Sequence, residues 1–217
     1  MARRNKNAKR KWNPRFAALC LLTLFTLAGA GLWWMNRGLP GEKIQTPDWV
    51  EKDYLTVNPY SRPGTPLTKI NGVVIHYVGN PGTTAKANRS YFETLALGAD
   101  AVYASAHFVV GLEGEVVQCI PLSEISYASN SRNEDTVAVE VCHPDDTGAF
   151  APASYDRAVE LTAWLCKEFK LNPQRDVLRH YDVSGKICPK YYVENPEAWA
   201  GFLTDTENAL ANLQAES

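Results

Sequence analysis

The chain has 217 residues, 45% hydrophobic and 21% charged, a composition typical of a globular protein and not of a disordered one. Its 22 basic residues are unevenly distributed, because seven of them lie within residues 1–15, where no acidic residue occurs. Without those seven, 15 basic residues stand against 24 acidic ones. The rest of the chain is therefore mildly acidic, which argues against binding to nucleic acid.

An uncharged run of 20 residues, 16–35, follows the basic segment. That is about the length needed to cross a bilayer. The basic flank predicts a cytoplasmic N-terminus, and two tryptophans near the end of the run suit the membrane interface. We expect a basic cytoplasmic segment (1–15), a transmembrane signal anchor (16–35) and an extracytoplasmic remainder at the cell membrane. The alternative is a signal peptide cleaved after Ala28-Gly29-Ala30, which would secrete the remainder.

Residues 36–66 are rich in proline, glycine, asparagine and threonine. Such segments stay extended rather than helical, so a linker is expected here. Four apolar residues offer the alternative that this segment docks as an N-terminal arm: Trp49, Val50, Tyr54 and Leu55. Residues 67–217 are expected to form one domain.

The first half of that domain reads as strands around one helix. Residues 73–78 are a continuous apolar run, typical of a strand buried on both faces. Thr83 or Thr84 can cap a helix that extends to Leu97 and ends at Gly98. Two apolar segments, 106–110 and 115–120, flank a glycine-rich loop and predict a hairpin.

The second half reads as one more strand and two amphipathic helices. Residues 137–142 alternate, so that Val137, Val139 and Val141 share one face. Ser154 is expected to cap the next helix and Asn172-Pro173 to end it, and the last helix is expected to begin at Asn195-Pro196. These elements predict an α/β domain with a central mixed β-sheet covered by helices.

Glu140 departs from the apolar pattern of its strand. Its neighbours on the same face, Ala138 and Cys142, are small, so there is open space around the carboxylate. A glutamate on a solvent-exposed strand face would need no explanation. A role as general base requires that Glu140 lie beside a reacting centre, which the local pattern does not establish.

A second unusual segment spans residues 179–189, Arg-His-Tyr-Asp-Val-Ser-Gly-Lys-Ile-Cys-Pro. It brings His180, Lys186 and Cys188 together, and imidazole and thiolate are strong zinc ligands. Gly185 allows a sharp turn, so that both ligands can face one ion. A third ligand must come from elsewhere, and His76, at the end of the strand 73–78, is the best candidate.

Four segments occur in the order seen in zinc-dependent N-acetylmuramoyl-L-alanine amidases, and they are Ile75-His76-Tyr77, Ser105-Ala106-His107-Phe108-Val109-Val110, Val137-Ala138-Val139-Glu140-Val141-Cys142 and the segment 179–189. Over residues 69–210, approximately, the chain resembles this family, which also contains phage endolysins and peptidoglycan recognition proteins. The resemblance implies that His76, His180 and Cys188 hold Zn²⁺. It further implies that Glu140 is the general base and Lys186 an electrophilic helper.

The function implied by the resemblance is hydrolysis of peptidoglycan at the amide bond between N-acetylmuramic acid and L-alanine, by a monomeric enzyme. The rival is a peptidoglycan-binding module without activity. Relatives of that kind lack the cysteine ligand, so Cys188 favours the enzyme. The chain also departs from the family pattern. Ala106 replaces a tyrosine that is catalytic in some members, and Tyr127-Ala128-Ser129 lies where a histidine is often found.

The remaining polar candidates are interpreted as structural. His107 is expected to be a structural histidine of its strand, and His143 a solvated loop residue. Asp182 either orients a ligand or forms a surface salt bridge. Three cysteines are expected to be buried free thiols, with a Cys119–Cys142 bridge as the alternative: Cys119, Cys142 and Cys166.

Overall fold

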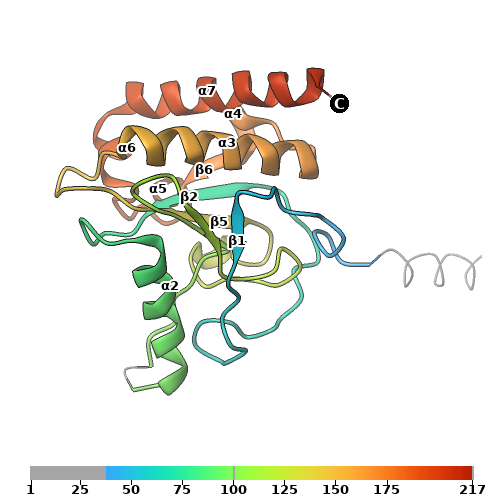
Figure 1. Cartoon of the computed structure of the whole chain (residues 1–217), viewed down its shortest axis with the longest axis vertical. Coiled ribbons are helices and arrows are strands. Elements are labelled where there is room, and N and C mark those ends of the chain that lie inside the picture. Colours follow the sequence, from blue (N-terminus) through green and yellow to red (C-terminus); the bar gives the residue numbers. More distant parts are fainter. Residues whose placement is uncertain (1–37, 100, 217) are drawn as a thin grey trace, which may run out of the picture. The chain divides into compact units, whose positions relative to one another are not determined.

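A mixed six-stranded β-sheet forms the centre of the unit Leu39–Ser217 (Figure 1). The computed structural model describes residues 38–99 and 101–216. In spatial order the strands are β1 (Val50–Lys52), β4 (Val116–Gln118), β3 (Phe108–Val110), β5 (Val137–Val141), β2 (Val73–Tyr77) and β6 (Val177–Arg179). Among the described strand pairs, β3 and β4 are antiparallel, as expected of a hairpin, and the others are parallel.

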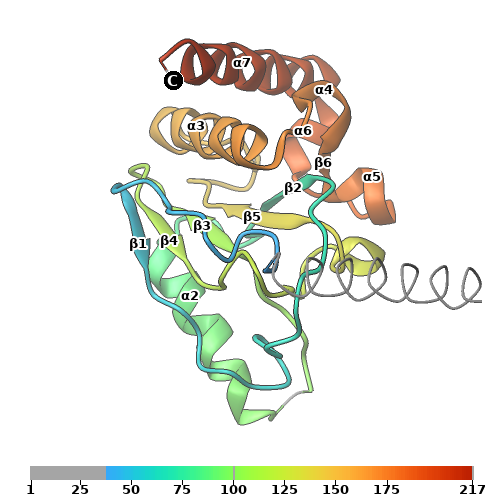
Figure 2. The same ribbon diagram turned by 90° about the vertical axis from the view of Figure 1, so that its right-hand side faces the viewer.

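Helices cover both faces of this sheet, as Figure 2 shows. α3 packs on one face and α7 packs on the outer side of α3, whereas α2 covers the other face. The helical elements are α2 (Ala85–Thr94), η1 (Leu95–Leu97), η2 (Asn130–Arg132), α3 (Pro152–Phe169), α4 (Pro173–Asp176), α5 (His180–Ser184), α6 (Lys190–Glu194) and α7 (Pro196–Ala215). The expected α/β domain with a central mixed sheet is confirmed.

The alternation along β5 divides its side chains between two cores. Val137, Val139 and Val141 belong to the core that also contains the apolar stripes of α3 and α7. Ala138 and Cys142 belong to the core under α2. The predicted alternation is therefore confirmed. Its physical cause is that successive side chains of a strand point to opposite faces, and both faces of this strand are covered by helices.

The helix ends agree with the sequence in part. The Thr84 hydroxyl accepts a hydrogen bond from the Ala87 N–H (3.2 Å), and α7 begins at Pro196, both as predicted. The predicted Ser154 cap is wrong, because α3 already begins at Pro152. The buried Ser154 hydroxyl instead donates to the Gly111 carbonyl (2.9 Å) and so ties α3 to the hairpin loop.

The end of α3 also differs from the expectation. The helix ends at Phe169, and Lys170 takes the left-handed conformation, with φ of 57°. Asn172-Pro173, expected to stop the helix, begins α4, in which the Asn172 side chain accepts from the Arg175 N–H. Asparagine followed by proline suits a helix start as well as a helix stop, so the local pattern does not distinguish the two.

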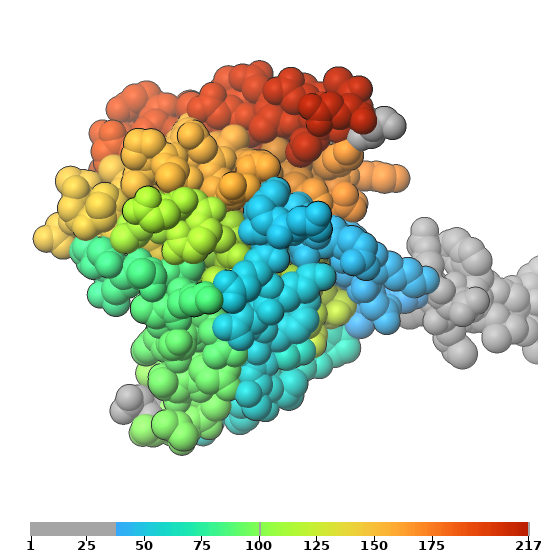
Figure 3. All heavy atoms as spheres, viewed as in Figure 1, coloured from blue at the N-terminus to red at the C-terminus, as the bar shows by residue number. Residues whose placement is uncertain are grey.

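Residues 39–66, within the segment expected to be a linker or an arm, form a docked arm. β1 pairs with β4 in parallel, and Leu55 is buried. Arg89 of α2 donates to the backbone carbonyls of Asp53 and Tyr54, which holds the arm against this helix. Figure 3 shows the arm in blue and cyan on the surface beside the green α2.

The thiols of Cys119, Cys142 and Cys166 are free and buried, as expected, and no disulfide joins the described cysteines. The predicted anchor, residues 16–35, and the basic segment before it lie outside the described residues. None of the helices within the described ranges combines the length and the apolar character that a membrane crossing requires.

Candidate active site

Three adjacent parallel strands, β5, β2 and β6, deliver polar side chains to the same edge of the sheet. In the register of β2 and β5, His76 is paired with Glu140. On the other side of β2, Ile75 is paired with Arg179, the last residue of β6, and His180 follows as the first residue of α5. The carboxyl ends of neighbouring parallel strands therefore place two histidines and a carboxylate together.

The turn at Gly185 returns the chain to this edge. Gly185 ends α5 in the left-handed conformation, with φ of 76°, and its N–H donates to the Tyr181 carbonyl. The Tyr181 N–H in turn donates to the Cys188 carbonyl (2.9 Å). These bonds close the motif so that Cys188 lies next to His180, and the turn predicted from Gly185 is confirmed.

His76, His180 and Cys188 form a compact, buried cluster. One potential ligand atom from each lies within 4.8 Å of the other two. Cys188 Sγ lies 3.8 Å from His76 Nδ1, and the two imidazole ring centres are 4.6 Å apart. Two nitrogens and a sulfur in this arrangement could hold a metal ion.

Each histidine uses its Nε2 atom for a hydrogen bond away from the cluster. His76 Nε2 lies 3.2 Å from the Ser129 hydroxyl, and His180 Nε2 lies 2.7 Å from the side-chain oxygen of Asn130. His180 Nδ1 is buried without a hydrogen-bond partner among the described residues. A buried polar atom without a partner is costly, so this nitrogen fits a ligand that the described residues do not supply.

Glu140 lies inside the site and not on an open strand face. One carboxylate oxygen, Oε1, is 4.0 Å from His76 Nδ1, and the other, Oε2, is buried and unpartnered in the described part of the chain. Burial raises the pKa of Glu140 to about 8, and the Lys186 ammonium partly opposes this rise. Burial lowers the pKa of His76 far below its usual value, so this imidazole is uncharged and its 4.0 Å contact with Glu140 is not an ion pair.

Burial also governs the other two members of the cluster. It raises the pKa of the Cys188 thiol to about 12, and Glu140 adds to that rise. It lowers the pKa of His180, and the Lys186 charge acts in the same direction. A cation bound between the two imidazoles and the thiol would lower the pKa of the thiol, because an opposite charge favours the thiolate.

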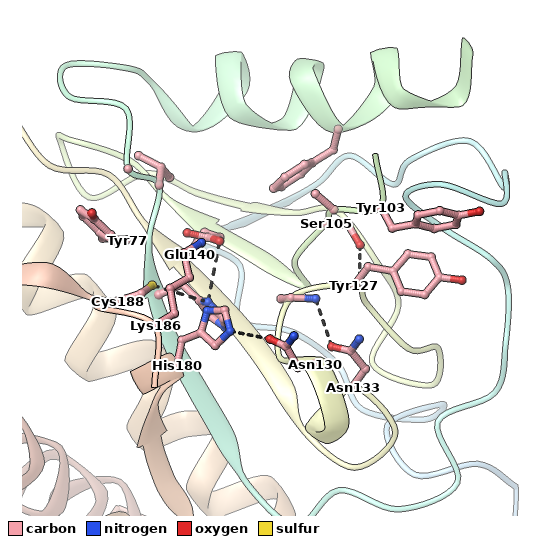
Figure 4. A pocket seen from close by; sticks show the side chains of 16 residues that line it. Tyr77, Tyr103, Ser105, Tyr127, Asn130, Asn133, Glu140, His180, Lys186 and Cys188 are labelled. Atoms are coloured by element: carbon pink, nitrogen blue, oxygen red, sulfur yellow. Dashed lines mark hydrogen bonds and ion pairs between the residues drawn. The ribbon is translucent and has the colours of Figure 1, made fainter. Parts of the chain in front are cut away.

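The cluster opens into a cleft of about 700 Å³. Figure 4 shows Glu140, Lys186, His180 and Cys188 gathered at one end of it, with Tyr103 and Tyr127 at the other end. The five candidate residues named from the sequence, His76, Glu140, His180, Lys186 and Cys188, all line this cleft. The structure brings them together, and their chemical roles stay predictions.

Two other histidines lie elsewhere in the domain. His107 is fully buried, with Nε2 donating to the Glu124 carbonyl (2.9 Å), which confirms its structural interpretation. The expectation of a solvated His143 is wrong. That side chain is only 1% exposed, and its ring lies 5.0 Å from the ring of Tyr77. Its Nδ1 atom hydrogen-bonds the Asp145 carbonyl, so a tight loop encloses it.

Asp182 makes a salt bridge and does not touch a candidate ligand. Its carboxylate pairs with the Arg179 guanidinium (2.7 Å) and accepts from the Arg179 N–H (2.9 Å), which caps α5. The partners of the histidine rings are instead Ser129 and Asn130. Sequence reasoning missed both, because they lie about 50 residues from the histidines that they contact and carry no local motif.

Known proteins share this sequence pattern and this fold. A family model described as N-acetylmuramoyl-L-alanine amidase matches residues 66–191. The chain is 31% identical over 175 residues to N-acetylmuramoyl-L-alanine amidase CwlL of Bacillus licheniformis, covering 75% of this chain and 48% of that protein. It is 33% identical over 169 residues to N-acetylmuramoyl-L-alanine amidase BlyA of Bacillus subtilis (strain 168), covering 69% and 44%. The chain thus spans about half the length of these curated relatives.

A solved structure gives the same fold. A mutant endolysin from Bacillus subtilis superposes with a TM-score of 0.61 at 23% identity, over 72% of this chain and 97% of that one. The family expected from the four motifs is confirmed, since the matched model spans more than half of the 217 residues. The chain belongs to the N-acetylmuramoyl-L-alanine amidase family.

Proposed function

We propose that this chain hydrolyses peptidoglycan at the amide bond between N-acetylmuramic acid and L-alanine, with Zn²⁺ held by His76, His180 and Cys188. The observation that carries the proposal is the meeting of these three side chains with Glu140 in one cleft of a family member. The donor set suits zinc, because two imidazoles and one thiolate leave a fourth position open. The unpartnered Nδ1 atom of His180 supports the same choice.

A zinc ion in this site would supply a water molecule with a pKa near 7 and would polarise the carbonyl of the amide. Glu140 accepts the proton of the attacking water and returns it to the nitrogen of the departing L-alanine. Its elevated pKa suits this double task, because a group that titrates near neutral pH can both take and give a proton. The buried Oε2 atom, without a protein partner in the described ranges, is available for that exchange.

Lys186 stabilises the negative charge that develops on the carbonyl oxygen. Its ammonium group lies close enough to shift the pKa values of His76, Glu140 and His180. A fixed positive charge beside a low-dielectric site typically contributes a few kcal/mol to a transition state that carries negative charge. The tyrosine that some relatives use is replaced by the buried Ala106, so Glu140 and Lys186 carry the proton transfer and the charge stabilisation here.

Digestion of purified peptidoglycan tests the proposal. The zinc-loaded chain should release stem peptides with a free N-terminal L-alanine and leave glycan strands with intact muramic acid, both visible by mass spectrometry. Cleavage at another bond, or binding without cleavage, would contradict the proposal. Binding without cleavage would favour the peptidoglycan-binding module. A chelator should abolish the release of peptides, and added zinc should restore it.

We further propose that the domain acts outside the cytoplasm, tethered to the cell membrane by residues 16–35. The basis is the uncharged run behind a basic segment in the sequence. Protease added to intact cells should degrade the domain while a cytoplasmic marker survives. A soluble product that begins at Gly31 would contradict the anchor and favour the cleaved signal peptide.

A further inference from the structure

Two consecutive residues, Ser129 and Asn130, contact both histidines of the candidate metal site. The Ser129 hydroxyl lies 3.2 Å from His76 Nε2, and Asn130 Oδ1 lies 2.7 Å from His180 Nε2. Neither contact is local in sequence, and Figure 4 shows Asn130 directly beside His180. One loop therefore touches the outer nitrogen of each ring.

The bond to Asn130 determines which nitrogen of His180 is free. An amide oxygen only accepts hydrogen bonds, so His180 Nε2 must carry the hydrogen. In a neutral imidazole the other nitrogen then presents its lone pair. That nitrogen, Nδ1, is the buried atom for which the described residues supply no partner. The Asn130 contact thus selects the tautomer that a metal ion needs.

The loop that carries Asn130 is held in place by its own hydrogen bonds. Asn133 Oδ1 accepts from the N–H groups of Ala128 (3.1 Å) and Ser129 (2.6 Å). Asn130 itself has φ of 50°, a left-handed conformation that asparagine adopts more easily than most residues. Ser129 is buried. These features fix the position of the Asn130 side chain before any ligand binds.

We infer that Asn130 is a positioning residue for the metal site: it holds His180 as the Nε2–H tautomer and orients its ring, so that Nδ1 is preorganised for the ion. The inference rests on the proposed zinc site. Hydrogen-bonding partners of this kind typically change metal affinity by about 10–100-fold when they are removed. The longer contact between Ser129 and His76 can orient the second ring, but it does not select a tautomer, because a hydroxyl both donates and accepts.

Asn130→Gly tests the inference, because glycine tolerates the left-handed backbone but removes the oxygen. Zinc affinity, measured by competition with a chromophoric chelator, should fall by about 10–100-fold. Asn130→Asp keeps an acceptor at the same place and should retain the affinity within a few-fold. Lys170→Gly is the matched control. It relieves another left-handed residue, with φ of 57°, which lies at the end of α3 and does not line the cleft, and it should leave zinc binding unchanged.

A second readout does not depend on the metal. In the zinc-free protein, ¹H–¹⁵N spectra of the histidine rings should show His180 with its hydrogen on Nε2, and Asn130→Gly should lose this single tautomer. An Asn130→Gly protein that binds zinc as tightly as the unaltered chain and keeps the tautomer would overturn this inference but not the proposed zinc site. An unaltered chain that binds no zinc would overturn the proposed function on which it rests.

Discussion

His107 and His180 lie in the same domain, but the fold uses their rings differently. His107 Nδ1 accepts from the Ala138 N–H (3.0 Å), and its Nε2 donates to the Glu124 carbonyl (2.9 Å), so the backbone occupies both ring nitrogens. His180 gives only Nε2 to Asn130 and keeps Nδ1 free of described partners. A free ring nitrogen alone does not identify a ligand, because His143 Nε2 is also buried without a described partner; His180 differs in that it lies in one cluster with His76 and Cys188.

The largest expected effect is loss of the metal through the third member of the cluster. Cys188→Ser replaces a soft thiolate by a hydroxyl that stays protonated, so zinc affinity should fall by more than about 100-fold, beyond the usual effect of an outer partner. Equilibrium dialysis with metal analysis measures this. Cys166→Ser, which alters a buried thiol of α3, is the matched control and should keep full zinc. Full zinc and full activity in Cys188→Ser would refute the ligand set.

Glu140→Gln is expected to alter the chemistry and not the binding of the metal. Glu140→Gln keeps the size of the side chain but removes its capacity to accept a proton. The turnover number should fall by roughly 10²–10⁴-fold, while zinc content stays unchanged. Glu160→Gln, on the exposed side of α3, controls for loss of a carboxylate. Unaltered turnover in Glu140→Gln would remove the general base from the account.

His107, the structural histidine of the pair compared above, gives a prediction on the stability of the fold. Burial lowers its pKa to about 4, so between pH 6.5 and pH 4 the unfolded chain binds a proton that the folded chain does not. Neutral His107 thus makes its full contribution to the free energy of unfolding above pH 6.5, and this contribution is lost as the pH falls to 4. It amounts to about 3 kcal/mol across that window.

Chemical denaturation of the zinc-free chain at several pH values measures this contribution. The free energy of unfolding should decrease with falling pH more steeply in the unaltered chain than in His107→Gln, where the titrating group is absent. Equal slopes in the two proteins would show that burial does not lower the pKa of His107.

The smallest effect is expected for Asp182. The sequence allowed two roles for this residue, which were to orient a metal ligand or to form a surface salt bridge. Since its carboxylate contacts Arg179 and not a candidate ligand, Asp182→Asn should leave zinc affinity unchanged within about two-fold. The cost should be limited to about 1 kcal/mol of stability from the weakened cap and ion pair. A ten-fold loss of zinc affinity in this variant would show instead that Asp182 helps to orient a metal ligand.

The fold was predictable where a strand is buried on both faces. The apolar run of β2 and the alternation of β5 both follow from helices covering the sheet. β1 and β6 were not predicted as strands, because each lies at an edge of the sheet and takes its place from pairing with one neighbour. Ser154 was misread as a cap, because its partner is the carbonyl of Gly111, 43 residues away.

The candidate site, too, could be predicted from the sequence only in part. His180, Lys186 and Cys188 were identified because one turn brings them together, and the turn depends on the local conformation of Gly185. The contacts of Ser129 and Asn130 with the rings could not be predicted, because segments far apart in the sequence create them. A motif identifies side chains that one turn brings together, whereas the hydrogen-bond partners of those side chains depend on tertiary packing.

X-ray absorption at the zinc edge of the zinc-loaded chain tests the central claim most directly. We predict one sulfur at about 2.3 Å and two imidazole nitrogens at about 2.0–2.1 Å, with a light atom in the fourth position. The sulfur should disappear from the spectrum of Cys188→Ser. A zinc environment without sulfur in the unaltered chain would contradict a metal site made of His76, His180 and Cys188.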